Sequence, residues 1–506
     1  MKKGTPRVLG MIAAGLGLIL LLVMVGVWRD QQAVRLFKDA LIAGGENLKV
    51  NELIPPYFAE AHQAAIELTG AASRFPNNSP IVSLNPPRKM RIIAPGKATV
   101  GWQVPDLREE AGQTNRWEDL DAELAAAEPV LRELRKLLKS PSFNWNLAYG
   151  QGFSLLMPHL AKIKQIVQWL ATATMNDLHA SRLDLALANH TAMLQAVNSL
   201  QDEPLIISQL VRAACAAIAF TATWEALQTN GWTDAQLGEM QAAWETIRFA
   251  RSLERSLEME RAMGVEALAR SRSSHAELHR QLAGLALPDT AARRVGTKRP
   301  RWVNEFAAIW SDSVRRLRTA GRDHLWQWVW SYGDEYHYLR TVEARLKALR
   351  AAEANWMPIG IRLPIDDDFI APARQDGVAP RHLFSTHLLS FLDRTLQRVK
   401  RIETQRELAV TAVALKRFRL RHERWPADLN ALVPGFLGQL PMDPMDGQTL
   451  RYRLNSDGSF TLYSVNVDGK DDSGDPTPPK DKAKSHDFAY GRDMVWPVPA
   501  DVKSLF

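Results

Sequence analysis

An uninterrupted apolar segment near the N-terminus constrains the fold of this chain more than any other feature. No charged side chain occurs from Val8 to Trp28, and aliphatic residues fill the centre of the segment. About 21 residues at about 1.5 Å per residue span a hydrocarbon layer of about 30 Å, and backbone groups inside lipid must bond within a helix. The segment therefore predicts one transmembrane helix over residues 8–28.

The charges that flank this segment predict its orientation. Lys2, Lys3 and Arg7 precede it, whereas Arg29 and Asp30 follow it and cancel. Because positively charged flanks stay on the cytoplasmic side, we expect residues 1–7 to form a cytoplasmic tail. Everything after the helix is then expected on the far side of the membrane.

A cleaved signal peptide is the alternative interpretation of the same segment. The basic start fits a signal peptide, but the apolar run is longer than a typical signal core. Its end, Val25-Gly26-Val27-Trp28, has no small-x-small cleavage site, and no Cys follows that could carry a lipid. We expect an uncleaved anchor, and the cleaved form stays open as the alternative.

Composition places the rest of the chain among ordinary globular proteins and gives no sign of nucleic-acid binding. The chain has 506 residues, of which 46% are hydrophobic and 24% charged, and these proportions are typical of packed domains. The net charge of +7 is dispersed, and the one dense basic stretch, 293–301, contains Gly and Pro and is expected to be a loop. Cys215 is the single cysteine, which excludes an intramolecular disulfide.

Helical periodicity dominates the middle of the sequence. Apolar residues at helical spacing predict helices over 118–138 and 177–200, and Thr233 with Gln236 forms a capping box at the start of another. Paired helices of this kind alternate with short polar turns between about 155 and 270, which favours stacked helical hairpins in a solenoid-like array. The predicted fold class is therefore mainly α for a helical domain over 29–352.

Tryptophan is unusually frequent, and its densest cluster lies in this helical domain. The chain has 16 tryptophans, and Trp326, Trp328 and Trp330 stand within five residues. On a helix, Trp326 and Trp330 share one face and Trp328 points elsewhere. The cluster is either a wide core contact or a partner-binding surface, because Trp often carries such surfaces.

No recognisable catalytic motif is present in the sequence. There is no phosphate-binding loop, no GxSxG elbow and no HExxH motif. His275 and His279 share a helix face as zinc ligands can, but no Cys lies nearby, and we expect a polar helix surface rather than a metal site. We expect a non-enzymatic protein, and the sequence identifies no small-molecule substrate. The alternative is an enzyme whose site is assembled from dispersed residues of the helical domain.

The chain changes character after the helical domain. A segment rich in Pro and Asp, residues 353–392, connects the helical domain to the C-terminal part. It includes the start of a long amphipathic helix. Two strand patterns follow near the C-terminus, over 450–454 and 460–465. The turn 455–458 between them, Asn-Ser-Asp-Gly, predicts a β-hairpin.

Several motifs follow one another in this C-terminal part. They are Phe418-Arg419 through Trp425-Pro426, Leu429 to Val433, Asp443-Pro444 through Tyr452, Phe460 to Gly469, and Asp493. This order resembles the C-terminal part of the major pseudopilin of type II secretion systems. The resemblance covers 393–506 and implies a long helix packed on a small antiparallel sheet, an α+β unit.

The resemblance also implies a calcium site in the acidic terminal loop. Calcium takes six to eight oxygen ligands from carboxylates, carbonyls and water. The candidate ligands are Asp468, Asp471, Asp472, Ser473, Asp475 and Asp493. An acidic loop without a bound ion is the alternative.

The sequence departs from the pseudopilin pattern at the N-terminus. That family carries a Glu at the fifth position after its processing site, whereas the fifth residue after Gly10 is Gly15. We therefore do not expect assembly into a pilus by the family's route. The expected function is an interaction or scaffold protein, anchored in a bacterial inner membrane with its bulk in the periplasm. Its expected partners are envelope or secretion-system proteins and no nucleic acid.

Overall fold

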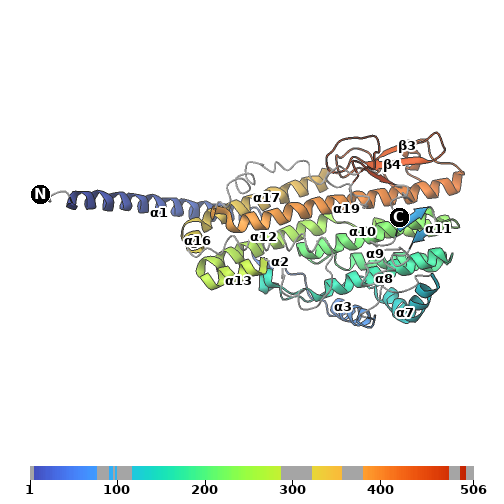
Figure 1. The fold of residues 1–506 in the computed structure, drawn as a ribbon, viewed down its shortest axis with the longest axis horizontal. Coiled ribbons are helices and arrows are strands. Elements are labelled where there is room, and N and C mark those ends of the chain that lie inside the picture. The colour runs from blue at the N-terminus through green and yellow to red at the C-terminus, as the bar shows by residue number, and fades with distance from the viewer. Residues whose placement is uncertain are drawn as a thin grey trace.

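The computed structural model describes residues 5–76, 91–94, 97–99, 117–285, 322–355, 380–477 and 491–496. Helices dominate these ranges, and a three-stranded antiparallel sheet lies near the C-terminus (Figure 1). The basic stretch 293–301 and most of the Pro/Asp-rich connection, residues 356–379, lie outside the described residues.

Helix α1 joins the apolar segment to the body of the protein. It runs from Thr5 to Ala43 as one helix of 39 residues, and its N-terminal half protrudes from one end of the body (Figure 1). The protruding side chains are exposed; the larger ones are Leu16, Leu18, Ile19, Leu20, Leu21, Leu22, Val23, Met24 and Val25. The prediction of an N-terminal helix long and apolar enough to cross a membrane is confirmed.

Long helices that run along the longest axis build the body (Figure 1). They are α8 (Pro158–His179), α9 (Leu183–Asn198), α10 (Ile206–Gln228), α11 (Asp234–Glu245), α12 (Ala250–Ser273), α17 (Ser331–Asn355) and α19 (Leu383–His422). Helix α10 is also long and apolar enough to cross a membrane, but most of it is buried among α8, α9, α12 and α19. It is the central helix of the core.

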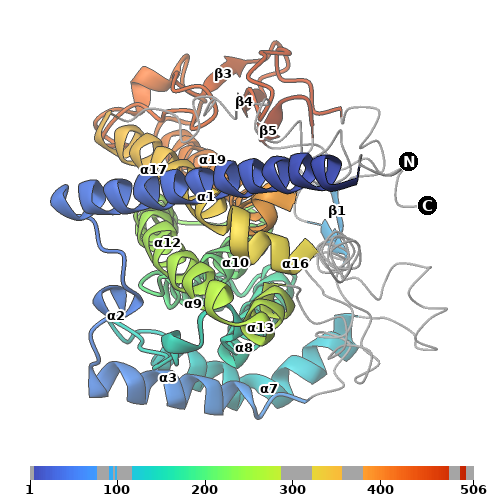
Figure 2. The ribbon, with the colours of Figure 1, turned by 90° about the vertical axis from the view of Figure 1, so that its left-hand side faces the viewer.

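The remaining elements complete the body. They are α2 (Val50–Leu53), α3 (Ala59–Ala72), β1 (Arg91–Ala94), β2 (Lys97–Thr99), α7 (Trp117–Leu137), η2 (Tyr149–Ser154), α13 (His275–Leu285), α16 (Arg322–Leu325), η3 (Trp326–Trp330), η4 (Pro380–His382) and η5 (Leu429–Leu432). Helices α3 and α7 pack on α8 at one edge of the body. Figure 2 looks onto the end from which α1 protrudes, where α13 and α16 lie.

Local sequence signals correspond closely to some of these elements and not to others. The capping box of Thr233 and Gln236 begins α11 as predicted, and the helix predicted over 118–138 is α7. A single helix over 177–200 is wrong, because α8 ends at His179 and α9 begins at Leu183. Ser181 adopts a left-handed φ of 59°, and Asp177 accepts hydrogen bonds from the backbone and side chain of Arg182, which closes a turn.

The C-terminal sheet has the predicted hairpin at its centre. Strands β3 (Arg451–Leu454), β4 (Phe460–Ser464) and β5 (Met494–Trp496) pair antiparallel in that order. Leu454 pairs with Phe460 across the turn, where Gly458 has a φ of 80° that side chains with a Cβ rarely adopt.

Helix α19 belongs both to the helical body and to the C-terminal unit. It packs on α10 and α11 on one side and on β4 on another. Every residue from 408 to 415 is buried, so this part of the helix is covered around its whole circumference. One hydrophobic cluster accordingly runs from α1 to β5.

Candidate functional site

The acidic loop that follows β4 forms turns with its own carboxylates. Asp468, Asp471 and Asp475 each accept a hydrogen bond from the backbone N–H two residues further on. Such bonds stabilise a local turn and occupy one acceptor position of each carboxylate. Ser473 lies in the second of these turns with a φ of 62°.

Basic and phenolic groups compensate several of these acids. Arg492 lies 3.9 Å from the carboxylate of Asp472 and 3.6 Å from that of Asp475. The hydroxyl of Tyr463 donates to Asp471 at 3.0 Å. Arg492 offsets part of the local negative charge, and the hydroxyl of Tyr463 satisfies one acceptor of Asp471.

Asp493 differs from the other acids because it is buried. Its Oδ2 accepts the N–H groups of Gly474 at 2.7 Å and Asp475 at 3.3 Å, so the loop folds over this carboxylate. Its Oδ1 is buried and has no hydrogen-bond partner among the described residues. Burial raises the pKa of Asp493, the backbone N–H groups oppose that rise, and the charge of Asp471 adds to it.

The donor set around Asp493 is compatible with calcium chemistry. No three His, Cys, Asp or Glu side chains gather into a metal-binding group within the described ranges. A hard cation at this position would use the Oδ1 of Asp493 and the nearby Asp471, with carbonyl oxygens and water completing the shell. Ser473 and Asp475 lie beside this pair, but they meet it through backbone N–H groups that donate to Asp471 and Asp493.

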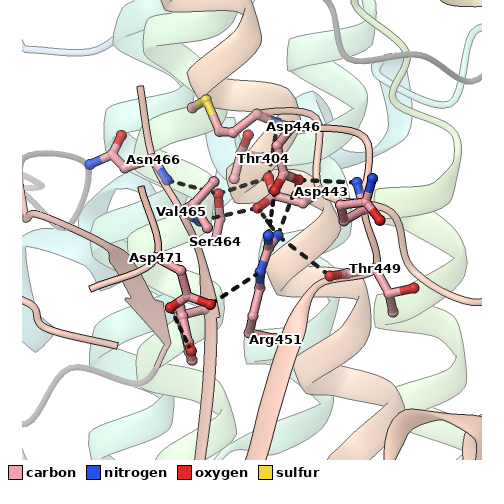
Figure 3. A network of polar contacts seen from close by, with 12 residues as sticks. Thr404, Asp443, Asp446, Thr449, Arg451, Ser464, Val465, Asn466 and Asp471 are labelled. Atoms are coloured by element: carbon pink, nitrogen blue, oxygen red, sulfur yellow. Dashed lines mark hydrogen bonds and ion pairs between the residues drawn. The ribbon is translucent and has the colours of Figure 1, made fainter. Parts of the chain in front are cut away.

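A second polar cluster, centred on Asp443, lies beside the loop (Figure 3). The buried carboxylate of Asp443 accepts hydrogen bonds from four groups. These are the N–H of Met445 (2.9 Å), the hydroxyl of Ser464 (2.8 Å), the N–H of Val465 (3.1 Å) and the guanidinium of Arg451 (3.0 Å). This Asp443 cluster joins the 443–448 turn to β3 and to the end of β4.

Arg451 extends the cluster toward the acidic loop. It binds Asp446 through two nitrogens and lies 3.8 Å from Asp471 (Figure 3). From α19, the ammonium of Lys400 donates to the carbonyl of Met445 at 3.0 Å, and burial lowers the pKa of Lys400. The sequence analysis named Asp443 only as part of a motif and did not predict this connecting role. In the sequence, this role is indicated only by Arg451, a residue of opposite charge in the strand that follows Asp443.

The three tryptophans of the 326–330 cluster lie in different environments. Trp326 is fully buried, and its indole N–H donates to Asp334 at 2.9 Å. Trp330 is partly buried against the core, whereas Trp328 is 78% exposed. They occupy η3, a wide π-type turn between α16 and α17.

Two buried acids after this turn hold helices together. Asp334 accepts the N–H groups of Phe384 at 2.8 Å and Ser385 at 3.1 Å, and so caps the first turn of α19. Glu335 pairs with Lys38 of α1 and with Arg272 of α12, the latter at 2.7 Å. These carboxylates connect four helices at the end of the body from which α1 protrudes.

The histidine pair of α13 forms a small surface group. The Nε2 atoms of His275 and His279 lie 3.1 Å apart, and His324 of α16 stacks on His275 with ring centres 4.4 Å apart. All three histidines are exposed or nearly so. The described residues supply no metal-binding group here.

Comparisons of the chain with models of protein families, with curated proteins and with solved structures found no match. Function is therefore inferred from the chain's own residues.

Proposed function

We propose that this protein is a single-pass membrane protein whose helix α1 spans the bilayer and whose body lies on the far side from the N-terminus. The observation that carries the proposal is the contrast between the two halves of α1. The half up to Val25 exposes aliphatic side chains on all sides, and the second half is fixed to the body through the Lys38–Glu335 pair. Continuous apolar exposure of this kind is unfavourable in water and favourable in lipid.

The orientation is testable because the protein offers a clean background for cysteine labelling. Cys215 is the only cysteine and is buried. Ser456→Cys, in the exposed hairpin turn, is expected to react with a membrane-impermeant maleimide in cells with a permeabilised outer membrane and an intact inner membrane. Labelling only after the inner membrane is lysed would place the body in the cytoplasm and overturn the orientation.

The body acts, in this proposal, as a non-enzymatic scaffold for envelope proteins. Its buried acids Asp334, Glu335 and Asp443 are used to join elements. A long helix that packs on a three-stranded antiparallel sheet supports the proposed kinship with pseudopilins, together with the order of the sequence motifs. The proposed partners are components of a type II secretion or pilus-like assembly.

Photo-crosslinking in native membranes tests the partner. A photoreactive residue at Leu454, which is exposed in the hairpin, samples the pseudopilin-like unit, and one at Ile66 of α3 samples another face of the body. Crosslinks from position 454 to secretion or pilus components are expected. Recovery of the protein alone, or of unrelated envelope proteins from both positions, would contradict the link to secretion.

The acidic loop adds a calcium proposal to this function. We infer that Asp493 and Asp471 hold a calcium ion that closes the loop over the sheet. The support is the buried, unpaired Oδ1 of Asp493 and the negative charge of Asp471 beside it. A bound ion stabilises the folded state through mass action.

Calcium is expected to raise the unfolding midpoint of the full-length protein relative to a chelator-treated sample. Asp493→Asn removes a ligand charge while it keeps an acceptor for the loop N–H groups, so this variant is expected to lose the calcium response. Asp457→Asn, in the exposed hairpin turn, is the control and keeps the response. Equal midpoints with calcium and with chelator would mean that Arg451 and Arg492 alone neutralise the loop.

A further inference from the structure

Two exposed apolar side chains stand at the end of the body from which α1 protrudes. Trp328 in η3 is 78% exposed and Leu325, at the end of α16, is 46% exposed. They lie three residues apart, at the junction of α16 with the π-type turn η3. The neighbouring Trp326 is anchored in the core by Asp334, so the turn that presents Trp328 is held in place.

Contacts between α1 and α17 show which part of α1 lies next to the η3 turn. Asp30 lies beside Gly333, where an added Cβ would meet the Asp30 carboxylate at 3.0 Å. Further along both helices, Phe37 contacts Tyr336 with ring centres 5.6 Å apart.

Three residues beyond the end of α1, Glu46 binds Arg350 of α17. Residue numbers thus rise together, and the two helices run in the same general direction.

The position of Trp328 relative to the apolar segment follows from this register. Trp328 belongs to η3, which α1 contacts directly, and it precedes Gly333 in the chain. Because Asp30 lies beside Gly333, η3 meets α1 near the end of the apolar segment. Trp28, which is also exposed, lies at that level.

We propose that Trp328 and Leu325 insert into the interfacial layer of the bilayer and give the body a second contact with the membrane beside α1. This inference rests on the proposed function, in which α1 spans the membrane. Indole rings favour the membrane–water interface because they combine an apolar ring with a polar N–H. Because α1 enters the bilayer at this level, lipid is the partner that we expect these two side chains to contact. The contact restricts how the body can tilt on its anchor.

Site-directed spin labelling of the full-length protein in vesicles tests this contact. The vesicles contain phosphatidylethanolamine and phosphatidylglycerol in equal amounts. The buried Cys215 leaves one reactive thiol in each of L325C, L20C and L454C. Position 20 lies in the apolar half of α1, and position 454 is an equally exposed leucine in the β3–β4 hairpin. Collision with oxygen reports lipid, and collision with a water-soluble nickel complex reports water.

The expected result is a lipid-exposed label at 20, a shallow lipid-exposed label at 325 and a water-exposed label at 454. Adding Trp328→Ala to L325C is expected to move that label toward water, and Trp328→Phe to move it less. If the label at 325 is as exposed to water as the one at 454 while the label at 20 is in lipid, the proposed interfacial contact is refuted. The transmembrane role of α1 would still be supported. An immobilised label at 325 that neither reagent reaches would mean that protein covers the turn. A water-exposed label at 20 would overturn the anchor and this inference together.

Discussion

Buried polar side chains explain at the residue scale how the elements of this protein are joined. Asp443, Asp334 and Glu335 each connect segments that are far apart in the sequence, and each is buried. A buried charge is tolerated only when it is paired or hydrogen-bonded, so the removal of one partner leaves the others unsatisfied. Substitutions at these positions are therefore expected to cost more than substitutions of equally polar surface residues.

Asp443→Ala is expected to lower the free energy of unfolding by about 3–5 kcal/mol, because it leaves three buried donors without their acceptor and removes one of the carboxylates that Arg451 binds. Denaturant titration of the purified protein measures this loss. Asp443→Asn keeps the shape of the side chain and one acceptor oxygen. We expect it to lower the free energy of unfolding less than Asp443→Ala does. If Asp443→Ala matched Asp457→Asn in its effect, the cluster would not be structural.

His190 makes a pH-dependent contribution to stability. The hydroxyl of Thr223 donates to the carbonyl of Ala219, so its oxygen accepts from the Nε2 of His190 at 2.7 Å. The Nδ1 of His190 is buried and has no partner among the described residues. Burial lowers the pKa of His190 to about 4, because the charged ring would lose its hydration.

The sign of the pH effect follows from this lowered pKa. Above about pH 6.5 the ring is neutral in both folded and unfolded chains, and the stability is complete. As the pH falls toward 4, only the unfolded chain gains the proton, and about 2–3 kcal/mol is lost by pH 4.5. His190→Gln keeps a donor near Thr223, so its stability relative to wild type is expected to rise by that amount between pH 7.5 and 4.5. Denaturant titrations at both pH values measure the difference. Parallel profiles would contradict the assignment, and His422→Gln, on the surface, serves as the control.

Helix α19 shows at the element scale how tertiary contacts determine where a helix begins. His382 occupies its N-cap position without a side-chain cap. The cap comes instead from Asp334, which belongs to α17 and binds the N–H groups of Phe384 and Ser385. A cap of this kind satisfies donors that the helix itself leaves unpaired. It also fixes the end of α19 next to η3 and α1.

Asp334→Ala is expected to speed amide exchange over the first two turns of α19 and to lower the free energy of unfolding by about 2–4 kcal/mol. Hydrogen–deuterium exchange with mass spectrometry resolves the first effect. Asp334→Asn keeps one acceptor, so its exchange rate and its free energy of unfolding are expected to lie between those of wild type and Asp334→Ala. Unchanged exchange over 383–390 in Asp334→Ala would show that packing alone holds this end of the helix.

At the scale of the whole molecule, the C-terminal unit of α19 and the three-stranded sheet forms one core with the helical body. Arg417 of α19 pairs with Asp234 of α11 at 2.9 Å, and Gln241 of α11 donates to the carbonyl of Phe436 at 2.8 Å. Phe220 of α10 meets Trp496 of β5 with ring centres 4.9 Å apart. The sheet and the helical body therefore share their buried surface through α19.

The fragment 380–506 is consequently expected not to fold by itself. Without α10 and α11 one side of α19 would expose its apolar residues, and the fragment would lose much of the burial that stabilises it. Near-ultraviolet circular dichroism and the dispersion of amide resonances measure its tertiary structure. A fragment with native-like dispersion would be an independently folding module, and the shared core would then be unnecessary for its stability.

Sequence alone determined the features that depend on neighbours along the chain. The uncharged run 8–28 predicts a helix because lipid-length apolar segments have few other stable forms, and α1 confirms it. The capping box at Thr233 and the hairpin turn at 455–458 were predictable for the same reason, since each is closed by residues within a few positions. The break between α8 and α9 was missed because hydrophobic spacing continues through it, and only the bonds between Asp177 and Arg182 reveal the turn.

The tertiary structure alone decided which polar and aromatic residues became structural. Asp334, Glu335 and Asp443 look like surface acids in the sequence, and partners at distances of tens to hundreds of residues bury them. The same contacts place Trp326 in the core and leave Trp328 exposed beside the anchor helix. Periodicity and spacing report the local backbone, whereas burial depends on what the rest of the chain packs against a residue, and that is fixed only when the helices assemble.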